Sequence, residues 1–248
     1  MSFTPDVRIF QGPAELFPAA ADEFAKLARD AVNRAGKFTV ALSGGSTPKK
    51  LFALLAEIPS TEIPWDRVFF FFGDERHVPP AHPDSNFRMA NESLLLKIHA
   101  RPENVFRIQA ELAAEIAARN YEQQLVQFFH LQPGEFPRFD LIMLGLGPDG
   151  HTASLFPGSK ALHEQHRLAV ANWVQKFNTD RITFTYPVLN HAACVMFLVT
   201  GQDKAEAVGQ VFEQKKQGPP AGAVDPDDGR LLWFLDKDAA SALPANLK

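Results

Sequence analysis

Short, almost wholly apolar runs recur along the chain, separated by longer stretches of mixed polarity. A run that is apolar at successive positions is typical of a strand covered by helices on both faces, as in a mostly parallel sheet. We therefore expect strands at residues 7–10, 38–42, 67–73, 139–146, 167–172, 181–186, 194–200 and 230–236.

The stretches between these runs place apolar residues at helical spacing. Gly36 is the expected C-cap of the first helix, Ser85 the expected N-cap of the second, and Asp203 opens the last. The helices are expected over 13–36, 85–98, 112–130 and 203–214. Strands that alternate with helices predict one α/β domain over residues 1–248, a mostly parallel, Rossmann-like sheet with helices on both faces.

Composition narrows the classes of partner. The net charge of −4 argues against a nucleic-acid or anionic membrane surface as partner, so an anionic ligand would be held by a few local cations. The single cysteine, Cys194, lies in an apolar run and is expected to pack as a small hydrophobe. With no signal-peptide pattern at the N-terminus and no apolar run near the roughly 20 residues of a membrane span, we expect a cytoplasmic enzyme.

Ligands of open α/β sheets bind at the carboxyl ends of strands, so the residues after each expected strand are the candidates. Glycine and hydroxyl residues follow the strand at 38–42, and Pro48 suits the first turn of a helix. Free N–H groups at such a helix start form an anion site. The alternative is an ordinary turn with Thr47 as N-cap. The candidate phosphate-binding residues are Ser43, Gly44, Gly45, Ser46 and Thr47.

Three charged residues, Asp74, Glu75 and Arg76, follow the very apolar strand at 67–73. Charges at a strand end are costly to desolvate unless they pair or meet a ligand. Asp74 is a candidate for substrate binding, and Arg76 could hold a phosphate or carboxylate oxygen bidentately. A solvated turn with a surface ion pair is the alternative. The nearby histidines lack the ligand spacing of a metal site, so no metal is expected.

The strand at 139–146 leads into the sequence GLGPDGH, which has the glycine spacing of a dinucleotide loop. Asp149 inside that loop would repel a pyrophosphate, and the next expected strand ends without an acid to bind a ribose. The sequence therefore predicts no NAD. Asp149 and His151 are instead suited to acid–base catalysis, although their spacing does not show that they touch. The alternative is a structural or solvated histidine.

No covalent nucleophile is evident, because Ser154 is outside a Gly-x-Ser-x-Gly elbow and Cys194 is in mid-strand. Water activated by His151 is the expected nucleophile. Lys204 lies in the first turn of a helix, where its charge opposes the helix dipole, so a role facing an anion competes with that of a surface lysine. Arg181 and Lys176 are weaker basic candidates.

Five motifs taken together resemble the 6-phosphogluconolactonase family. They are ALSGGSTP, GDERHVPPAHPDSNF, LGLGPDGHTASLFPGS, RITFTYPVLN and FLVTGQDKAEAV, in the family's order over roughly residues 7 to 236. The resemblance implies hydrolysis of 6-phospho-D-glucono-1,5-lactone, a small phosphosugar lactone, to 6-phosphogluconate without any cofactor. It also implies the fold of sugar-phosphate isomerases and deaminases, and we expect a monomer or weak homodimer.

The resemblance assigns roles to the motif residues. His151 would be the general base, Asp149 its partner, and Arg76 a residue at the lactone or its phosphate. The SGGST loop, Lys204 and Arg181 would hold the phosphate.

Glucosamine-6-phosphate deaminase resembles the same motifs, but it carries a glutamate where this chain has Phe156. Phenylalanine cannot shuttle the protons that ring opening and amine release need, which favours the lactonase. A non-catalytic sugar-phosphate sensor of the same fold is the third possibility. It would have no need for Asp149 and His151 together, and no DNA-binding segment is evident near the N-terminus.

Overall fold

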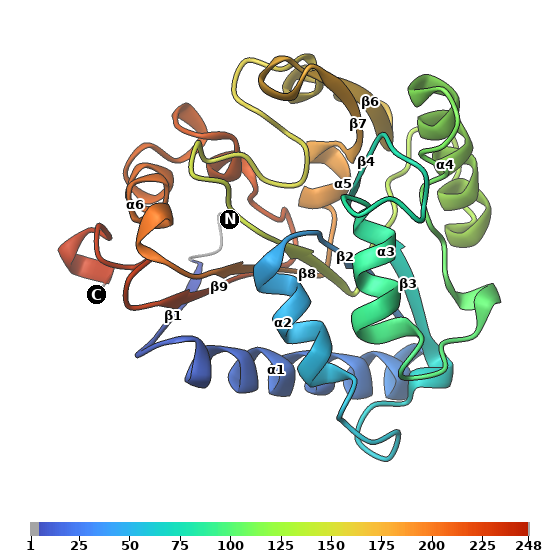
Figure 1. Ribbon diagram of the computed structural model, residues 1–248, viewed down its shortest axis with the longest axis horizontal. Coiled ribbons are helices and arrows are strands. Elements are labelled where there is room, and N and C mark those ends of the chain that lie inside the picture. Colours follow the sequence, from blue (N-terminus) through green and yellow to red (C-terminus); the bar gives the residue numbers. More distant parts are fainter. Residues whose placement is uncertain (1–4, 248) are drawn as a thin grey trace.

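The computed structural model of the chain describes residues 5–247 and contains a six-stranded main sheet (Figure 1). Its strands are β1 (Asp6–Phe10), β2 (Phe38–Leu42), β3 (Val68–Phe72), β5 (Leu141–Leu144), β8 (Cys194–Val199) and β9 (Arg230–Asp236). They lie in the order β1-β9-β8-β5-β2-β3, and each neighbouring pair is parallel. The mostly parallel α/β sheet expected from the apolar runs is confirmed.

Two of the expected strands belong elsewhere. A separate antiparallel sheet, in the order β4-β7-β6, is formed by β4 (Asp74–Arg76), β6 (Ala169–Val174) and β7 (Thr179–Phe184). The runs at 167–172 and 181–186 were therefore wrongly expected in the parallel sheet. The reason is their short connection, since parallel neighbours need a long crossover whereas antiparallel strands can join through a tight turn.

The helices largely follow the expected boundaries. They are α1 (Pro13–Ala35), α2 (Ser46–Leu55), α3 (Asn86–Ala90), α4 (Ala114–Phe129), α5 (Tyr186–Asn190) and α6 (Ala205–Gln214). Gly36 caps α1 in the left-handed conformation, and Ser85 caps α3 by accepting a hydrogen bond from the Arg88 N–H. The helix expected over 85–98 is not a single α-helix, because a π-helical turn follows α3 at Asn91–Leu95.

Helices cover both faces of the main sheet (Figure 1). Phe24 of α1 packs edge-on against Phe38 of β2, with ring centroids 5.4 Å apart. Phe212 of α6 packs against Trp233 of β9 at 5.2 Å, on the face opposite α1. In Figure 1, α1 runs below the sheet and the β6–β7 hairpin stands above it. None of the helices within residues 5–247 is long and apolar enough to cross a membrane.

The outer edge of β3 is hydrogen-bonded by residues from outside the sheet. The Tyr121 hydroxyl of α4 accepts from the Phe72 N–H and donates to the Phe72 carbonyl, both at 2.9 Å. The Phe106 N–H donates to the Phe70 carbonyl at 2.8 Å. Burial raises the pKa of the Tyr121 phenol far above its usual range, so the hydroxyl keeps its proton and can donate.

An ion-pair cluster joins α1 to the β1–β9 edge of the sheet. Glu23 of α1 is almost fully buried, and its two oxygens accept hydrogen bonds from Arg230 at 2.9 Å and Arg8 at 3.0 Å. Arg8 also pairs with Asp6 at 2.7 Å. Burial acts to raise the pKa of Glu23, but the hydrogen bonds from Arg8 and Arg230 outweigh it and hold that pKa below its usual value.

Replacing Glu23 by glutamine is expected to lower the free energy of unfolding by about 1–2 kcal/mol at pH 7, because two charge-assisted hydrogen bonds weaken and both arginines are partly exposed. The pKa of Glu23 is lowered in the folded state, so its contribution is present above the unfolded pKa near 4.5 and is lost as pH falls through the folded pKa. Urea unfolding of both proteins across this range measures the difference. Asp22→Asn, an exposed neighbour, is the control, and a difference that stays constant down to pH 3 would contradict the prediction.

Candidate active site

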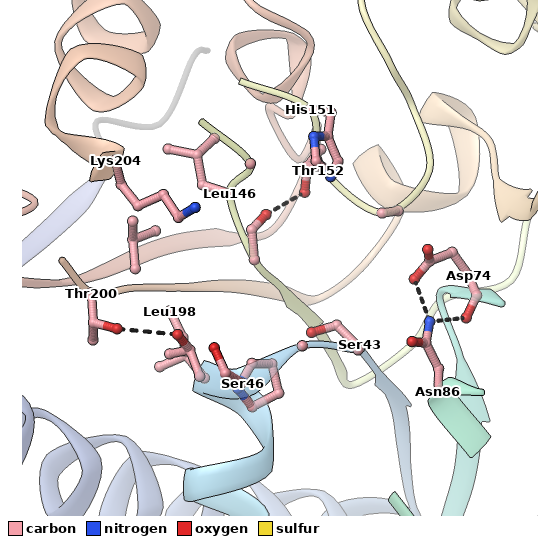
Figure 2. Close-up of a pocket in the computed structure, with 18 of the residues that line it drawn as sticks. Ser43, Ser46, Asp74, Asn86, Leu146, His151, Thr152, Leu198, Thr200 and Lys204 are labelled. Carbon is pink, nitrogen blue, oxygen red and sulfur yellow. Dashed lines mark hydrogen bonds between the residues drawn. The ribbon is translucent and has the colours of Figure 1, made fainter. Parts of the chain in front are cut away.

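The carboxyl ends of β2, β5 and β8 surround a cavity of about 240 Å³, together with the residues after β3 (Figure 2). Nine of the residues expected from the sequence line it, namely Ser43, Gly44, Gly45, Ser46, Thr47, Asp74, Arg76, His151 and Lys204. They come from four separate chain segments, which the parallel sheet brings together at one edge. Asp149 and Arg181 lie just outside this lining.

The start of α2 forms one wall of the cavity. Gly45 is the N-cap, with a left-handed φ of 109°, and the helix begins at Ser46. Thr47 is therefore inside the first turn, and its hydroxyl bonds to that of Thr200 at 3.1 Å; the alternative of Thr47 as N-cap is wrong. A Cβ at Gly44 would overlap the side chain of Asn86, so any larger residue here would displace that side chain. The wall thus combines free helix N–H groups with hydroxyls.

Lys204 faces this wall across the cavity (Figure 2). It ends the single 3-10 turn that precedes α6, and its side chain is only 22% exposed. Its ammonium pairs with Asp203 at 2.8 Å. On the same side as α2, the Ser43 hydroxyl is buried and has no hydrogen-bond partner among residues 5–247. A buried unpaired hydroxyl beside a helix start and an ammonium is suited to an anionic oxygen.

Arg76 is the second cation of the cavity. Its guanidinium donates to the Asp84 carbonyl at 2.9 Å, and no carboxylate of the described chain lies within ion-pair distance of it. Arg181 pairs with Arg76 across β4 and β7 but does not line the cavity; its guanidinium lies 5.2 Å from the Phe177 ring. Burial, and then the charge of Arg76, lower the pKa of Arg181. The Arg181 Nε is buried and has no hydrogen-bond partner within residues 5–247, so contact of Arg181 with a phosphate stays a prediction.

Asp74 joins three parts of the site. One of its oxygens accepts a hydrogen bond from the Ser154 hydroxyl at 2.6 Å, and the other accepts from the Asn86 amide at 3.2 Å. Asn86 packs on Gly44, so this network connects the loop that carries His151 to the start of α2. Both Asp74 oxygens are held by protein donors, which fits a carboxylate that fixes the walls of the cavity. Ser154 is 1% exposed and is occupied by Asp74, so it is not a free nucleophile.

Glu75 holds the segment that carries Arg76. Its buried carboxylate accepts hydrogen bonds from the backbone N–H groups of Arg76, Asn86 and Phe87 at 2.7–2.8 Å, and from the Ser85 hydroxyl at 3.0 Å. Burial raises the pKa of Glu75, while the three backbone donors act in the opposite direction. The Glu75 side chain therefore holds together the two ends of the loop between β4 and α3.

The loop after β5 presents His151 to the cavity. It turns at Gly150, with a φ of 72°, and the Gly147 N–H donates to the His151 carbonyl at 2.9 Å. The turn brings the His151 Nδ1 into direct contact with the Asp149 Oδ1. The two side chains expected to work together thus do touch, with His151 on the cavity wall and Asp149 behind it.

The surroundings of the pair fix its geometry and charge. Phe156 stacks on the His151 imidazole, with ring centroids 4.1 Å apart and an interplanar angle of 21°. Burial acts to raise the pKa of Asp149, but the hydrogen bond and charge of His151, with help from Lys176, hold that pKa below its usual value. Asp149 is therefore a carboxylate at neutral pH.

Two residues of the site, Asn86 and Thr200, line the cavity and were not singled out from the sequence. Phe156, noted from the sequence only as a difference from the deaminase, and Lys176, noted only as a weaker basic candidate, contact the Asp149–His151 pair. The only local signal was the position of Asn86 next to the expected N-cap Ser85. Within residues 5–247, no group of three His, Cys, Asp or Glu side chains is arranged to hold a metal ion.

This chain is similar to known proteins both in sequence and in structure. Residues 11–233 match the family described as glucosamine-6-phosphate isomerases/6-phosphogluconolactonase. A 6-phosphogluconolactonase of Nostoc sp. is 43% identical over 86% of this chain and 88% of its own length.

Solved structures agree with the sequence matches. The 6-phosphogluconolactonase from Trypanosoma cruzi has a TM-score of 0.89 and 31% identity, covering 99% of each chain. A monomeric glucosamine-6-phosphate deaminase shares the fold at a TM-score of 0.78 and 21% identity, over 96% of this chain and 99% of its own. The resemblance expected from the five motifs is confirmed, and the chain belongs to the glucosamine-6-phosphate isomerase/6-phosphogluconolactonase family.

Proposed function

We propose that this protein hydrolyses 6-phospho-D-glucono-1,5-lactone to 6-phosphogluconate, with His151 as the general base. The observation that carries the proposal is one cavity with two chemically different ends. The α2 start and Lys204 form an anion-binding end, and His151, backed by Asp149, forms a basic end. The relatives named 6-phosphogluconolactonase support the same substrate.

The protons can be followed from the hydrogen bonds. The His151 Nδ1 faces the Asp149 carboxylate, so in the neutral imidazole Nδ1 carries the hydrogen and Nε2 has the free lone pair. Nε2 takes a proton from water as the water oxygen attacks the lactone carbonyl carbon. The imidazolium then returns this proton to the ring oxygen as the bond from the carbonyl carbon to that oxygen breaks. The products are a carboxylic acid, which ionises, and a free hydroxyl.

The phosphate supplies orientation and takes no part in bond making. When the phosphate is bound at the start of α2 by the Ser46 and Thr47 segment and Lys204, the sugar extends across the cavity towards His151. Holding a reacting carbon near a base is worth several kcal/mol, since it replaces a bimolecular encounter by a unimolecular step. Arg76 would then face the lactone or its phosphate from the β4 side.

The direct test is hydrolysis of freshly generated 6-phosphogluconolactone, followed by proton release and compared with the spontaneous rate. Acceleration well above the spontaneous rate would support the proposal, and its absence would contradict it. Ammonia release from glucosamine 6-phosphate tests the deaminase alternative in the same preparation. We expect none, because Phe156 stacks on His151 where the deaminase has a carboxylate that can move protons.

Replacing Lys204 or Arg76 by methionine is expected to lower kcat/KM for the phosphorylated lactone by about 10–100-fold, the value of a charge-assisted hydrogen bond of roughly 1.5–3 kcal/mol. Turnover of unphosphorylated gluconolactone should change much less, because it lacks the charge that these residues attract. Lys26→Met, an exposed position on α1, removes the same charge far from the cavity and is the control. Equal losses on both substrates would show that the two residues do not bind the phosphate.

A further inference from the structure

The tip of the β6–β7 hairpin contacts the Asp149–His151 pair from outside the cavity. The Lys176 ammonium lies 3.3 Å from the Asp149 Oδ2, while the Asp149 Oδ1 contacts the imidazole. The next residue, Phe177, packs edge-on against Phe156 with ring centroids 5.9 Å apart, and Phe156 in turn stacks on His151. The Asp149 carboxylate is therefore held between an imidazole on one side and an ammonium on the other.

We propose that Lys176 is a positioning residue that sets the pH range over which His151 can act as a base. This inference rests on the proposed function, because it concerns the same base. Lys176 acts through Asp149 and touches neither the cavity nor the imidazole.

The argument is electrostatic. A carboxylate alone next to an imidazole stabilises the imidazolium and extends protonation of the base to higher pH. A lysine on the other oxygen of that carboxylate opposes this effect, because its charge repels the imidazolium. Removing a unit charge at this range, close to solvent, is expected to move the acid limb of the measured pH profile by about half a pH unit at low salt, and salt screens the effect. The same contact keeps Oδ1 turned towards the imidazole.

Other charged groups face the pair and must be considered. Arg76 and Lys204 line the same cavity and act in the same direction as Lys176, while Asp74 opposes them. Arg181 lies on the hairpin, over the Phe177 ring. None of these four changes when Lys176 is replaced, so comparing variants isolates the contribution of Lys176.

A structural role for Lys176 would have different consequences. Its side chain is 55% exposed, and an exposed ion pair contributes about 0–1 kcal/mol to folding. A variant without the ammonium is therefore expected to fold normally. If Lys176 formed only a surface ion pair, its replacement would leave the pH profile of the reaction unchanged.

The test is the pH dependence of kcat/KM for 6-phosphogluconolactone, corrected for spontaneous hydrolysis, in Lys176→Met, Lys176→Arg and wild type. The acid limb of Lys176→Met is expected about half a pH unit higher than wild type at low salt, which is an approximately threefold loss on that limb. The plateau should stay within about twofold, since the base itself is intact. Lys176→Arg should restore the wild-type limb, and high salt should bring the profiles together.

Two measurements separate failure of this inference from failure of the proposed function. Lys26→Met removes the same charge as Lys176→Met, but at an exposed position on α1. The acid limb of its pH profile should coincide with that of wild type. An NMR titration of the His151 ring, assigned with His151→Ala, gives the same shift independently of any reaction. Coincident limbs and titrations for wild type and Lys176→Met would overturn the role of Lys176 while leaving lactone hydrolysis intact. Absent hydrolysis with a shifted His151 titration would overturn the proposed function alone.

Discussion

Replacing His151 by alanine is expected to lower kcat for 6-phosphogluconolactone by about 10²–10⁴-fold, the usual contribution of a general base. The imidazole is the group on the cavity wall with a free nitrogen lone pair and a carboxylate behind it. KM should change little, because the anion-binding end at α2 and Lys204 is untouched. Proton release, corrected for the spontaneous reaction, measures both constants.

His163→Ala is the matched control, since this histidine is exposed and lies outside the cavity lining. It should keep wild-type kinetics. A kcat of His151→Ala within about tenfold of wild type would contradict the assignment of His151 as the base, whatever the effect on KM.

Replacing Gly147 by alanine is expected to lower kcat by about 10²-fold while changing stability little. A methyl group at this position would overlap the His151 imidazole and come within 2.8 Å of the Asp149 Oδ1. The imidazole is a side chain that can rotate away, so the protein need not unfold to accommodate the methyl group. The methyl group instead breaks the contact between His151 and Asp149. A displacement near 1 Å at a catalytic group lowers kcat by about 10²-fold.

Gly12→Ala adds the same methyl group outside the cavity lining, where no heavy atom lies within 4 Å of it. This control should keep the His151–Asp149 contact and most of kcat. Thermal unfolding of both variants shows whether the fold is retained. A Gly147→Ala enzyme with wild-type kcat would mean that the contact with Asp149 is unnecessary for turnover.

The main sheet is predictable from the sequence because burial on both faces leaves a local signature. β2 and β9 begin and end at the expected residues, and the residues after β2, β5 and β8 meet at one edge as parallel strands require. The start of α2 and His151 follow from this geometry, since each lies in the segment that follows a strand.

The antiparallel sheet could not be predicted in the same way. An apolar run shows that a strand is buried, but it does not show which strand it pairs with. The runs around β6 and β7 look like those of the main sheet, and β4 is too short to leave any pattern. The position of Lys176 beside Asp149 depends on this hairpin, so their contact is visible only in the fold.

The contact between Asp149 and His151 could be predicted only in part. Their spacing makes contact possible, but it depends on the left-handed turn at Gly150 and on the bracing of that turn by the Ala221 N–H, which donates to the Gly150 carbonyl at 3.0 Å. The position of Arg181 next to Arg76 depends likewise on the pairing of β4 with β7. Long-range geometry of this kind is absent from local sequence patterns.

The hydroxyl of Tyr121 also has a consequence for how copies of this protein meet in solution. An edge strand offers unpaired N–H and C=O groups to strands of other molecules, and apolar edges are common sites of aggregation. β3 consists of Val68 followed by four phenylalanines and stands at the edge of the main sheet. Because Tyr121 occupies both backbone groups of Phe72, and Phe106 occupies the carbonyl of Phe70, those groups are closed to an incoming strand. One phenol and one loop amide thus occupy backbone groups through which a strand of another molecule would pair with β3.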